Sequence, residues 1–269
     1  MPELPEVETV VRTLEHQIQN QKIKAIELFW PKVIEGDPKV FQRKLIGQRF
    51  QTFSRRGKYL LFGMDDCVLV VHLRMEGKFF LQMPTAPRNK HIHICFLLSN
   101  GLELRYQDTR KFGRMQVVPK DTDFAHFHDL GPEPFSDAFT AEYIHQYRKG
   151  KRLPVKSLLL DQSFVAGIGN IYADEILAAC HIRPGRSCAR LTRKNEEDIV
   201  EETRRILKAA IAAGGTTIRS YTSSLGVTGR FQLSCIVHGL KVCPQCGSEI
   251  KVKWIGGRSS YYCPQCQKV

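Results

Sequence analysis

Hydrophobic residues near the start of the chain recur with the spacing of an α-helix. Steps of three and four residues separate the members of this stripe, which are Val7, Val10, Val11, Leu14 and Ile18. Prolines and acidic residues stand just before it, and both are favoured in the first turn of a helix. The pattern therefore predicts an N-terminal helix.

Between about residue 23 and residue 118 the pattern changes to short apolar runs. Tyr59–Phe62 and Val68–Leu73 flank a turn-like pair of aspartates. The alternating segment His91–Phe96 precedes Ser99-Asn100-Gly101, a sequence typical of a hairpin turn. Several strands at this spacing predict an antiparallel β-sandwich that carries the N-terminal helix.

A stretch rich in glycine and proline, Leu130–Pro134, interrupts this pattern and indicates a domain boundary. Beyond it, Val155–Leu160, Asn170–Ala179 and Glu196–Ala213 carry apolar residues at helical spacing, and two glycines close the last of these segments. Thr216–Gly229 is polar, contains glycine and shows no periodicity, so we expect a mobile loop there.

Four of the nine cysteines form two CxxC pairs with sixteen residues between them: Cys243, Cys246, Cys263 and Cys266. This spacing presents four thiolates in the tetrahedral arrangement that Zn²⁺ prefers. Because four protein ligands leave no open position for a substrate, the predicted zinc ion is structural. The alternative interpretation is a group of redox-active or simply buried thiols.

The residues between the two cysteine pairs have the pattern of a β-hairpin. Ile250, Val252 and Trp254 alternate with polar residues, and two glycines then form a turn. Arg258 is therefore expected at the hairpin tip, where a cation suits contact with a phosphate. A solvated arginine is the alternative.

The other possible metal ligands are scattered. Five cysteines lie mostly among apolar neighbours and are expected to be small buried residues: Cys67, Cys95, Cys180, Cys188 and Cys235. An odd number of cysteines without a secretory signal argues against a disulfide framework. His91 and His93 have no cluster of partners, so we expect them at the sheet surface and not as metal ligands.

The charge of the chain points to a polyanionic partner. It has 40 Lys and Arg against 27 Asp and Glu, a formal net charge of +13. Nucleic acid is the simplest such partner, and a basic but inert surface is the alternative. No apolar run approaches the ~20 residues that span a membrane, and no cleaved leader is evident, so we expect no membrane association and a cytosolic protein.

The first residues carry candidate chemistry. Removal of Met1 would leave Pro2 with a secondary α-amine, and an α-amine titrates near ~8, so an uncharged lone pair is available at neutral pH. Such an amine attacks a sugar C1′ or a carbonyl and gives an iminium. Glu3 and Glu6 follow within one helical turn and could transfer protons beside it. The alternative is an ordinary helix start.

Two further segments are candidate phosphate-binding elements. Ala166–Tyr172 is a glycine-rich turn that opens a helix, and free amides at a helix start bind phosphate. Arg55–Lys58 is basic and stands at the entry to an apolar strand. A tight connection and a solvated strand end are the respective alternatives, and Lys58 becomes a candidate only if the fold brings it to the N-terminus.

Several motifs in order along the chain resemble the formamidopyrimidine-DNA glycosylase family. They are Pro2–Thr9, Arg56–Lys58, His72–Gly77, Leu130–Pro134, Asp161-Gln162, Gly167–Glu175 and the two CxxC pairs. The resemblance implies a bifunctional base-excision repair enzyme that removes oxidised purines, typically formamidopyrimidines and 8-oxoguanine, and cleaves the strand by β,δ-elimination. It also implies one structural Zn²⁺, damaged double-stranded DNA as partner, a monomer, and a cytoplasmic, nucleoid-associated location.

Patterns and resemblance together predict an α+β fold. We expect an N-terminal catalytic antiparallel β-sandwich with flanking helices at residues 1–131, followed by a linker at 132–150. A helix-two-turn-helix DNA-binding domain is expected at 151–234, and a four-cysteine β-hairpin zinc finger at 235–269.

The resemblance also implies roles for single residues. Pro2 matches the nucleophile, Glu3 the carboxylate that assists ring opening and elimination, and Glu6 a supporting acid. Lys58 matches the lysine that reaches the lesion's phosphates, and three residues match other phosphate contacts: His72, Asn170 and Arg258. Lys58 and Arg258 are expected to act in catalysis as well as in binding. Three match the side chains that fill the gap left by a flipped nucleotide: Met75, Arg110 and Phe112. Further DNA contacts are expected at Glu76, His91, Lys156, Ser220 and Tyr221, the last two in a loop that closes over the extruded base.

The chain departs from the family pattern in the zinc finger. His238–Cys243 is shorter than the usual Tyr-Gly-Arg segment ending in Pro-Cys, and Ser259-Ser260 stands where Gly-Thr is usual. The related endonuclease VIII branch, which prefers oxidised pyrimidines, is the nearest alternative, but its members typically begin Pro-Glu-Gly-Pro-Glu and this chain has Leu4. A catalytically silent DNA-binding protein is the other alternative. Pro2, Glu3 and Lys58 argue against it, but a chain that kept Met1 would be silent.

Overall fold

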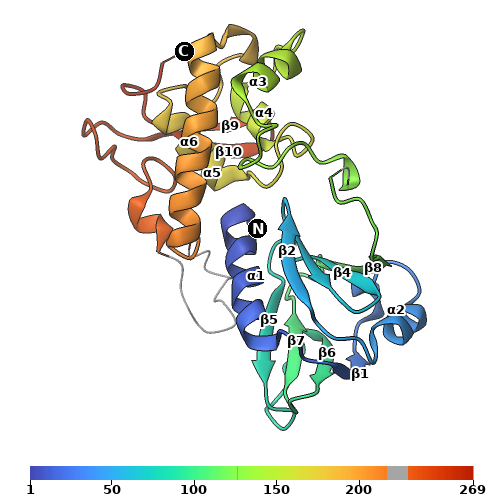
Figure 1. The fold of residues 1–269 in the computed structure, drawn as a ribbon. Coiled ribbons are helices and arrows are strands. Elements are labelled where there is room, and N and C mark those ends of the chain that lie inside the picture. Colours follow the sequence, from blue (N-terminus) through green and yellow to red (C-terminus); the bar gives the residue numbers. More distant parts are fainter. Residues whose placement is uncertain (126, 217–229, 269) are drawn as a thin grey trace. The chain divides into compact units, whose positions relative to one another are not determined.

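The computed structural model describes residues 1–125, 127–216 and 230–268. The chain divides into two compact units (Figure 1). The first comprises Met1–Phe124 and the described part of Gly214–Gly229, and the second comprises Ala125–Ala213 and Arg230–Val269.

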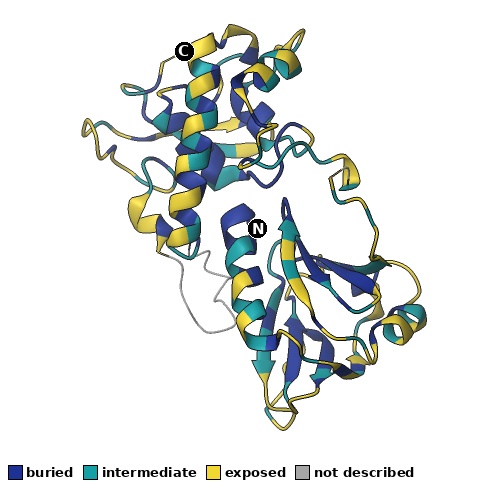
Figure 2. Ribbon diagram, viewed as in Figure 1, coloured by how far each residue is buried: buried dark blue, intermediate teal, exposed yellow. Residues whose placement is uncertain are grey.

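The first unit opens with the predicted helix, α1 (Leu4–Ile18). The backbone amide of Glu3 donates to Glu6 Oε2 at 2.9 Å, so the first turn is closed by a side chain of that turn. The whole predicted apolar stripe of α1 is buried, and Figure 2 shows the alternation of buried and exposed positions along the helix. The prediction of this helix is confirmed.

The predicted sandwich is confirmed as two four-stranded sheets in which all strand pairs are antiparallel. The first has the order β1 (Ile23–Leu28), β6 (Ile92–Leu98), β7 (Glu103–Gln107), β5 (Lys78–Gln82). The second has the order β2 (Thr52–Arg56), β3 (Tyr59–Gly63), β4 (Cys67–His72), β8 (Arg114–Pro119). Aromatic residues of both sheets fill a common core with α1, among them Phe62, Phe79, Phe96 and Tyr106.

One helix of this unit was not predicted. α2 (Pro38–Leu45) follows a short 3₁₀ turn at Pro31–Val33 and buries only Phe41 and Leu45, which are too few positions to reveal a helical period. Its start did carry a signal, because the Asp37 side chain accepts a hydrogen bond from the backbone amide of Lys39 at 2.8 Å.

The expected surface position of His93 is wrong. Its side chain is buried in β6, and Nε2 is 2.7 Å from the backbone oxygen of Asp108. The Trp30 ring covers it at a centroid distance of 5.3 Å, so the alternating sequence of this strand does not produce a solvent-facing side. Burial lowers the pKa of this imidazole and thereby favours its neutral form. His91 precedes the strand and is half-buried.

The second unit contains four α-helices in its described residues: α3 (Ala141–Arg148), α4 (Val155–Leu160), α5 (Asn170–Ala179) and α6 (Arg193–Ala212). Three of them were predicted, and α6 starts earlier than expected because Thr192 caps it by accepting from Asn195 N at 3.2 Å. Helix α3 lies within the segment expected to be a linker. Short 3₁₀ turns occupy Phe127–Asp129, Cys188–Arg190 and Phe231–Ser234, and the hairpin of β9 (Lys251–Ile255) and β10 (Arg258–Tyr262) is present as predicted.

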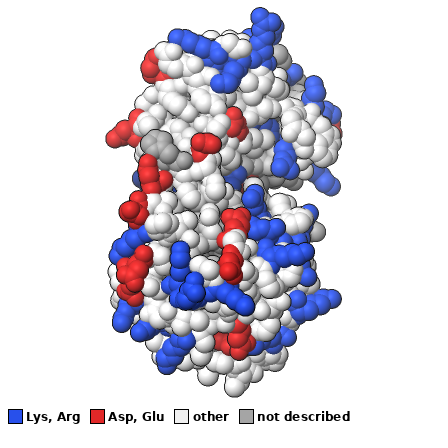
Figure 3. Space-filling view, turned by 90° about the vertical axis from the view of Figure 1, so that its right-hand side faces the viewer, with Lys and Arg blue, Asp and Glu red and all other residues white. Residues whose placement is uncertain are grey.

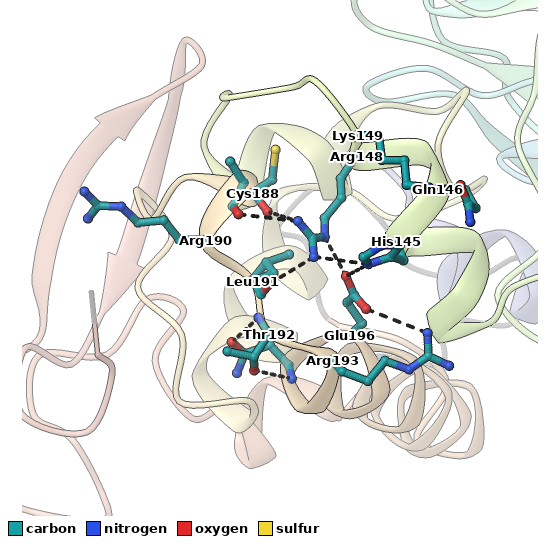
Figure 4. Close-up of polar contacts among 12 residues, drawn as sticks. His145, Gln146, Arg148, Lys149, Cys188, Arg190, Leu191, Thr192, Arg193 and Glu196 are labelled. Atoms are coloured by element: carbon teal, nitrogen blue, oxygen red, sulfur yellow. Dashed lines mark hydrogen bonds and ion pairs between the residues drawn. The ribbon is translucent and has the colours of Figure 1, made fainter.

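A polar cluster joins α3 to α6 and to the segment that precedes α6 (Figure 4). The Arg148 guanidinium donates to Glu196 Oε1 at 2.5 Å and to the backbone oxygen of Leu191 at 3.0 Å. His145 Nδ1 lies 3.1 Å from the same carboxylate oxygen, whose residue is fully buried. Because Glu196 Oε1 and the Arg148 guanidinium join α3 to the start of α6, we interpret the cluster as the support for these two helices.

The five scattered cysteines behave largely as expected, because four are buried and Cys235 is half-buried. No cysteine within the described residues forms a disulfide. Among the same residues, no helix has the length and apolar character needed to cross a membrane.

Candidate functional site

The N-terminus of α1 is held against the turn that carries Lys58. Arg55 in β2 donates to the Glu8 carboxylate of α1 at 2.9 Å, which fixes the helix beside the β2–β3 hairpin. Gly57 and Lys58 form the two-residue turn of this hairpin, and Gly57 adopts a φ of 55° that a tight turn of this kind needs. The fold thereby satisfies the condition under which Lys58 becomes a candidate site residue.

Four charged side chains act on the N-terminal amine. Burial lowers the pKa of the Met1 α-amine below its usual value. The carboxylates of Glu3 and Glu6 oppose this shift, whereas the charges of Lys58 and Arg110 lower the pKa further. An amine is therefore surrounded by two acids and two cations, and Glu3, Glu6 and Lys58 are all buried.

Glu6 is the central polar group of this arrangement. One oxygen accepts the Glu3 amide, and the other accepts both the amide of Thr216 at 2.8 Å and its hydroxyl at 3.1 Å. Gly215 adopts a φ of 79°, and a Cβ added there would lie 2.8 Å from Glu6 Oε1. Thr216 was expected in a mobile loop and is instead buried against α1, a contact that local sequence does not reveal.

We expect Glu6→Gln to reduce activity by roughly ten- to a hundredfold. An amide has one accepting oxygen where the carboxylate has two, so one of the buried donors loses its partner at a cost of about 1–3 kcal/mol. Cleavage of a damaged duplex, the activity that the sequence resemblance implies, measures the effect, and Glu15→Gln, a half-buried position further along α1, is the control. Equal activity of Glu6→Gln and wild type would contradict the bridging role.

His72 is the last residue of β4, in the same sheet as the β2–β3 hairpin that carries Lys58. It pairs with Tyr59 on one side and with Arg114 on the other, so three strands end in one row next to Lys58. The imidazole Nδ1 accepts from the amide of Arg74 at 3.0 Å, and the ring stands edge-on to Tyr59 at 4.6 Å. His72 is thus fixed in orientation as well as in position.

Two adjacent loops carry the expected gap-filling residues, and we call them the wedge loops. Loop 73–77 joins β4 to β5 and loop 108–113 joins β7 to β8, so both connect the two sheets. The strand pairs His72↔Arg114 and Lys78↔Gln107 frame them at either end. The first loop carries Met75 and Glu76 and the second carries Arg110 and Phe112, with the Arg110 guanidinium 4.8 Å from the centre of the Phe112 ring.

In the second unit, the position of Lys156 does not support the expected DNA contact. Its side chain is fully buried, and its ammonium lies 2.7 Å from Asp174 Oδ1 and donates to the backbone oxygen of Ser259 at 2.8 Å. The pair therefore joins α4 and α5 to the zinc hairpin. A buried ion pair of this kind supports a position and leaves no surface for a phosphate.

Asn170 and Arg258 occupy positions suited to phosphate contact. Asn170 is the first residue of α5, after Gly169, and a helix start of this kind favours an anion. Arg258 is exposed at the first position of β10. The hairpin tip approaches α4, because a Cβ added to Gly256 would lie 2.7 Å from the Ser157 hydroxyl.

The four cysteines of the two CxxC pairs form the predicted cluster. Their sulfur atoms all lie within 4.8 Å of one another, with 3.9 Å between Cys243 and Cys266 and 3.5 Å between Cys246 and Cys263. A tetrahedral site with zinc–sulfur bonds of about 2.3 Å requires sulfur separations of about 3.8 Å. These residues fit one structural Zn²⁺, and they rest on a small apolar core with Val237 and Ile250.

The segment that departs from the family pattern is anchored to α5. His238 Nδ1 lies 2.8 Å from Asp174 Oδ2, and the same oxygen accepts the amide of Tyr261 at 3.2 Å. The carboxylate of Glu175 accepts three successive backbone amides of residues 236–238.

Ser220 and Tyr221, expected in the loop over the lesion, lie outside the described residues.

Comparisons with known proteins give the same picture for the whole chain. Family models match the formamidopyrimidine-DNA glycosylase N-terminal domain at residues 1–115, the formamidopyrimidine-DNA glycosylase H2TH domain at 130–222, and the zinc finger found in FPG and IleRS at 241–269. Formamidopyrimidine-DNA glycosylase of Bacillus licheniformis is 46% identical over 100% of both chains, and that of Bacillus subtilis is 42% identical over 99% of both. The chain belongs to the formamidopyrimidine-DNA glycosylase family.

Solved structures of this glycosylase family agree with the assignment. Lactococcus lactis Fpg in complex with DNA containing an abasic site is 38% identical, with a TM-score of 0.94 over 99% of this chain and 100% of that one. The Lactococcus lactis enzyme with DNA containing N7-benzyl-Fapy-dG is 39% identical, with a TM-score of 0.93 over 100% of both chains. The resemblance drawn from the sequence motifs is confirmed.

Proposed function

We propose that the protein is a DNA glycosylase of base excision repair that removes oxidised purines and then cleaves the DNA strand. The observation that carries the proposal is that the carboxylates of Glu3 and Glu6 and the ammonium of Lys58 are buried and act on the α-amine of Met1, the residue before Pro2. The relatives named formamidopyrimidine-DNA glycosylase, and the Lactococcus lactis complexes with abasic-site and Fapy-dG DNA, support the choice of substrate.

The nucleophile would be the amine of Pro2 after removal of Met1. Its lone pair attacks C1′ of the damaged nucleotide, a C1′–N bond forms, and the bond to the base breaks as the base leaves with its electron pair. Opening of the sugar ring gives an iminium between Pro2 and C1′. The iminium acidifies the neighbouring C2′ protons, and loss of one expels the 3′ phosphate, then a second elimination expels the 5′ phosphate.

The carboxylates would manage the protons of this sequence. Glu3 is next to the attacking amine in the chain and is the candidate to protonate the ring oxygen and later to remove a proton. Glu6 already accepts three donors, so we assign it to holding the backbone of residues 3 and 216. Lys58 would bind the phosphates next to the lesion.

DNA binding would use basic residues of both units, together with the polar Asn170. Figure 3 shows Lys and Arg side chains on the face in view, with acidic side chains among them. Lys58 and His72 in the first unit, and Asn170 and Arg258 in the second, are the proposed phosphate contacts. Since such contacts release counterions, affinity should fall steeply as salt is raised. We further propose that the enzyme acts as a monomer in the bacterial cytoplasm and associates with the nucleoid.

The wedge residues give a prediction that separates base extrusion from bond chemistry. Extruding a stacked, paired nucleotide costs a few kcal/mol, and Met75 and Arg110 would offset part of this cost by occupying the vacancy. We expect Met75→Ala and Arg110→Ala to lower excision of 8-oxoguanine from a duplex by more than about tenfold. Cleavage of a preformed abasic site, measured in parallel, should change much less. Equal losses on both substrates would contradict the wedge role.

One assay tests the proposed function. Incubation with a duplex that contains 8-oxoguanine opposite cytosine should release the base and cleave the strand, and borohydride should convert part of the product into a covalent adduct. A parallel duplex with an oxidised pyrimidine separates this activity from that of the endonuclease VIII branch. Binding without cleavage of either duplex would identify a silent DNA-binding protein.

A further inference from the structure

The hydroxyl of Tyr106 is the atom against which both wedge loops pack. Tyr106 lies in β7 and is fully buried. A Cβ added to Gly77 would lie 2.3 Å from this oxygen, and one added to Gly113 would lie 1.7 Å from it. Gly77 ends the loop that carries Met75, and Gly113 ends the loop that carries Arg110, so one oxygen sets the approach of both loops.

The Asp108 carboxylate extends this arrangement along the second loop. Its Oδ1 accepts the backbone amide of Arg110 at 3.0 Å, and its Oδ2 accepts that of Gly113 at 2.8 Å. The Tyr106 hydroxyl donates to the same Oδ2 at 3.5 Å. Asp108 is buried, so loop 108–113 is fixed on both sides of its tip by a group that cannot reach the DNA.

Both loops contain a non-glycine residue in the left-handed region. Arg74, directly before Met75, has a φ of 54°, and Lys111, directly after Arg110, has a φ of 59°. Residues other than glycine rarely adopt this backbone conformation, which persists only where the surroundings impose it. Each wedge residue therefore stands next to a backbone bend, and the glycine that ends each loop packs against Tyr106.

We propose that Tyr106 is a positioning residue that sets the separation of Met75 from Arg110. Its hydroxyl touches both loops and, through Asp108, fixes the backbone of the second one. With the loops preset, the two wedge residues enter the DNA as a unit, and less conformational freedom is lost when a nucleotide is extruded. This proposal rests on the proposed function, because a preset wedge matters only to an enzyme that extrudes a base.

The test is Tyr106→Phe, which removes one oxygen and keeps the ring in the core. We expect excision of 8-oxoguanine from a duplex to slow by roughly tenfold, while cleavage of a preformed abasic site stays within about twofold of wild type. Stopped-flow fluorescence of a duplex with 2-aminopurine beside the lesion should show base extrusion slowed by the same factor. A residue that serves only the stability of the core would not change this signal selectively.

Two further variants keep the test decisive. Asp108→Asn has one accepting oxygen for two backbone amides and should give the same selective loss. It provides the test if Tyr106→Phe does not fold. Tyr143→Phe is the matched control, since the Tyr143 hydroxyl donates to the backbone oxygen of Phe164 at 2.8 Å in the second unit, and it should leave extrusion unchanged. Equal losses on both substrates, or no loss on either, would overturn the proposal. Failure of wild type to excise 8-oxoguanine would instead overturn the proposed function.

Discussion

Borohydride added during the reaction with an 8-oxoguanine duplex is expected to trap one covalent protein–DNA adduct, and peptide mapping is expected to place it on Pro2. The reason is that Pro2 becomes the first residue once Met1 is removed, and its amine then lies next to the buried Glu3 and Glu6. Burial already lowers the pKa of the adjacent Met1 α-amine. Pro2→Gly should lose base excision by at least about a hundredfold, because the secondary amine becomes a primary one. Some cleavage of a preformed abasic site should remain.

Two controls accompany this result. Pro5→Ala changes another buried proline of the same helix start and leaves the amine in place, so it should still form the adduct. The intact mass of the active protein should lack Met1. An adduct that maps to Lys58, or full activity of a chain that retains Met1, would contradict the assignment of Pro2.

The fold could be predicted where apolar residues recur at helical spacing over many residues, or where cysteines stand at the spacing of a metal site. The five apolar positions of α1 identify that helix, and the cysteine spacing with its alternating insert identifies the zinc hairpin. Helices α2 and α3 were not predicted, because each buries only two residues and two positions do not reveal a helical period. The surface position expected for His93 failed since Trp30, distant in sequence, covers it.

The candidate site could also be predicted only in part from the sequence. Motifs could point to Pro2, Glu3 and Lys58, because the chemistry needs those residue types. The residues that hold other parts of the site could not be read from local sequence: Thr216 binds Glu6 from 210 positions away, and Tyr106 packs against glycines of the two wedge loops. The burial of Lys156 was missed for the same reason, since its partner Asp174 comes from another helix.

Loss of zinc is expected to have the second large effect. Cys243→Ser removes one of four thiolates, and binding of a structural zinc is worth about 10–16 kcal/mol of folding free energy in zinc-finger peptides. A two-stranded hairpin such as β9–β10 is marginal by itself, so its arginine would no longer be presented to a phosphate. We expect the variant to lose the metal and at least about tenfold in DNA affinity, measured by elemental analysis and by titration of a damaged duplex.

Matched variants separate the metal from the contact that it supports. Cys235→Ser changes a cysteine outside the cluster and should keep both zinc and affinity. Arg258→Ala should keep zinc, weaken binding of every duplex sequence to a similar degree, and reduce the slope of log affinity against log salt by about one unit, the change expected when one phosphate contact is lost. The first unit should keep its folded circular dichroism signal in Cys243→Ser, because none of its described residues belongs to the cysteine cluster. Fully active protein without bound zinc would show that the metal does not hold the hairpin, and an unchanged salt slope in Arg258→Ala would remove this arginine from the phosphate contacts.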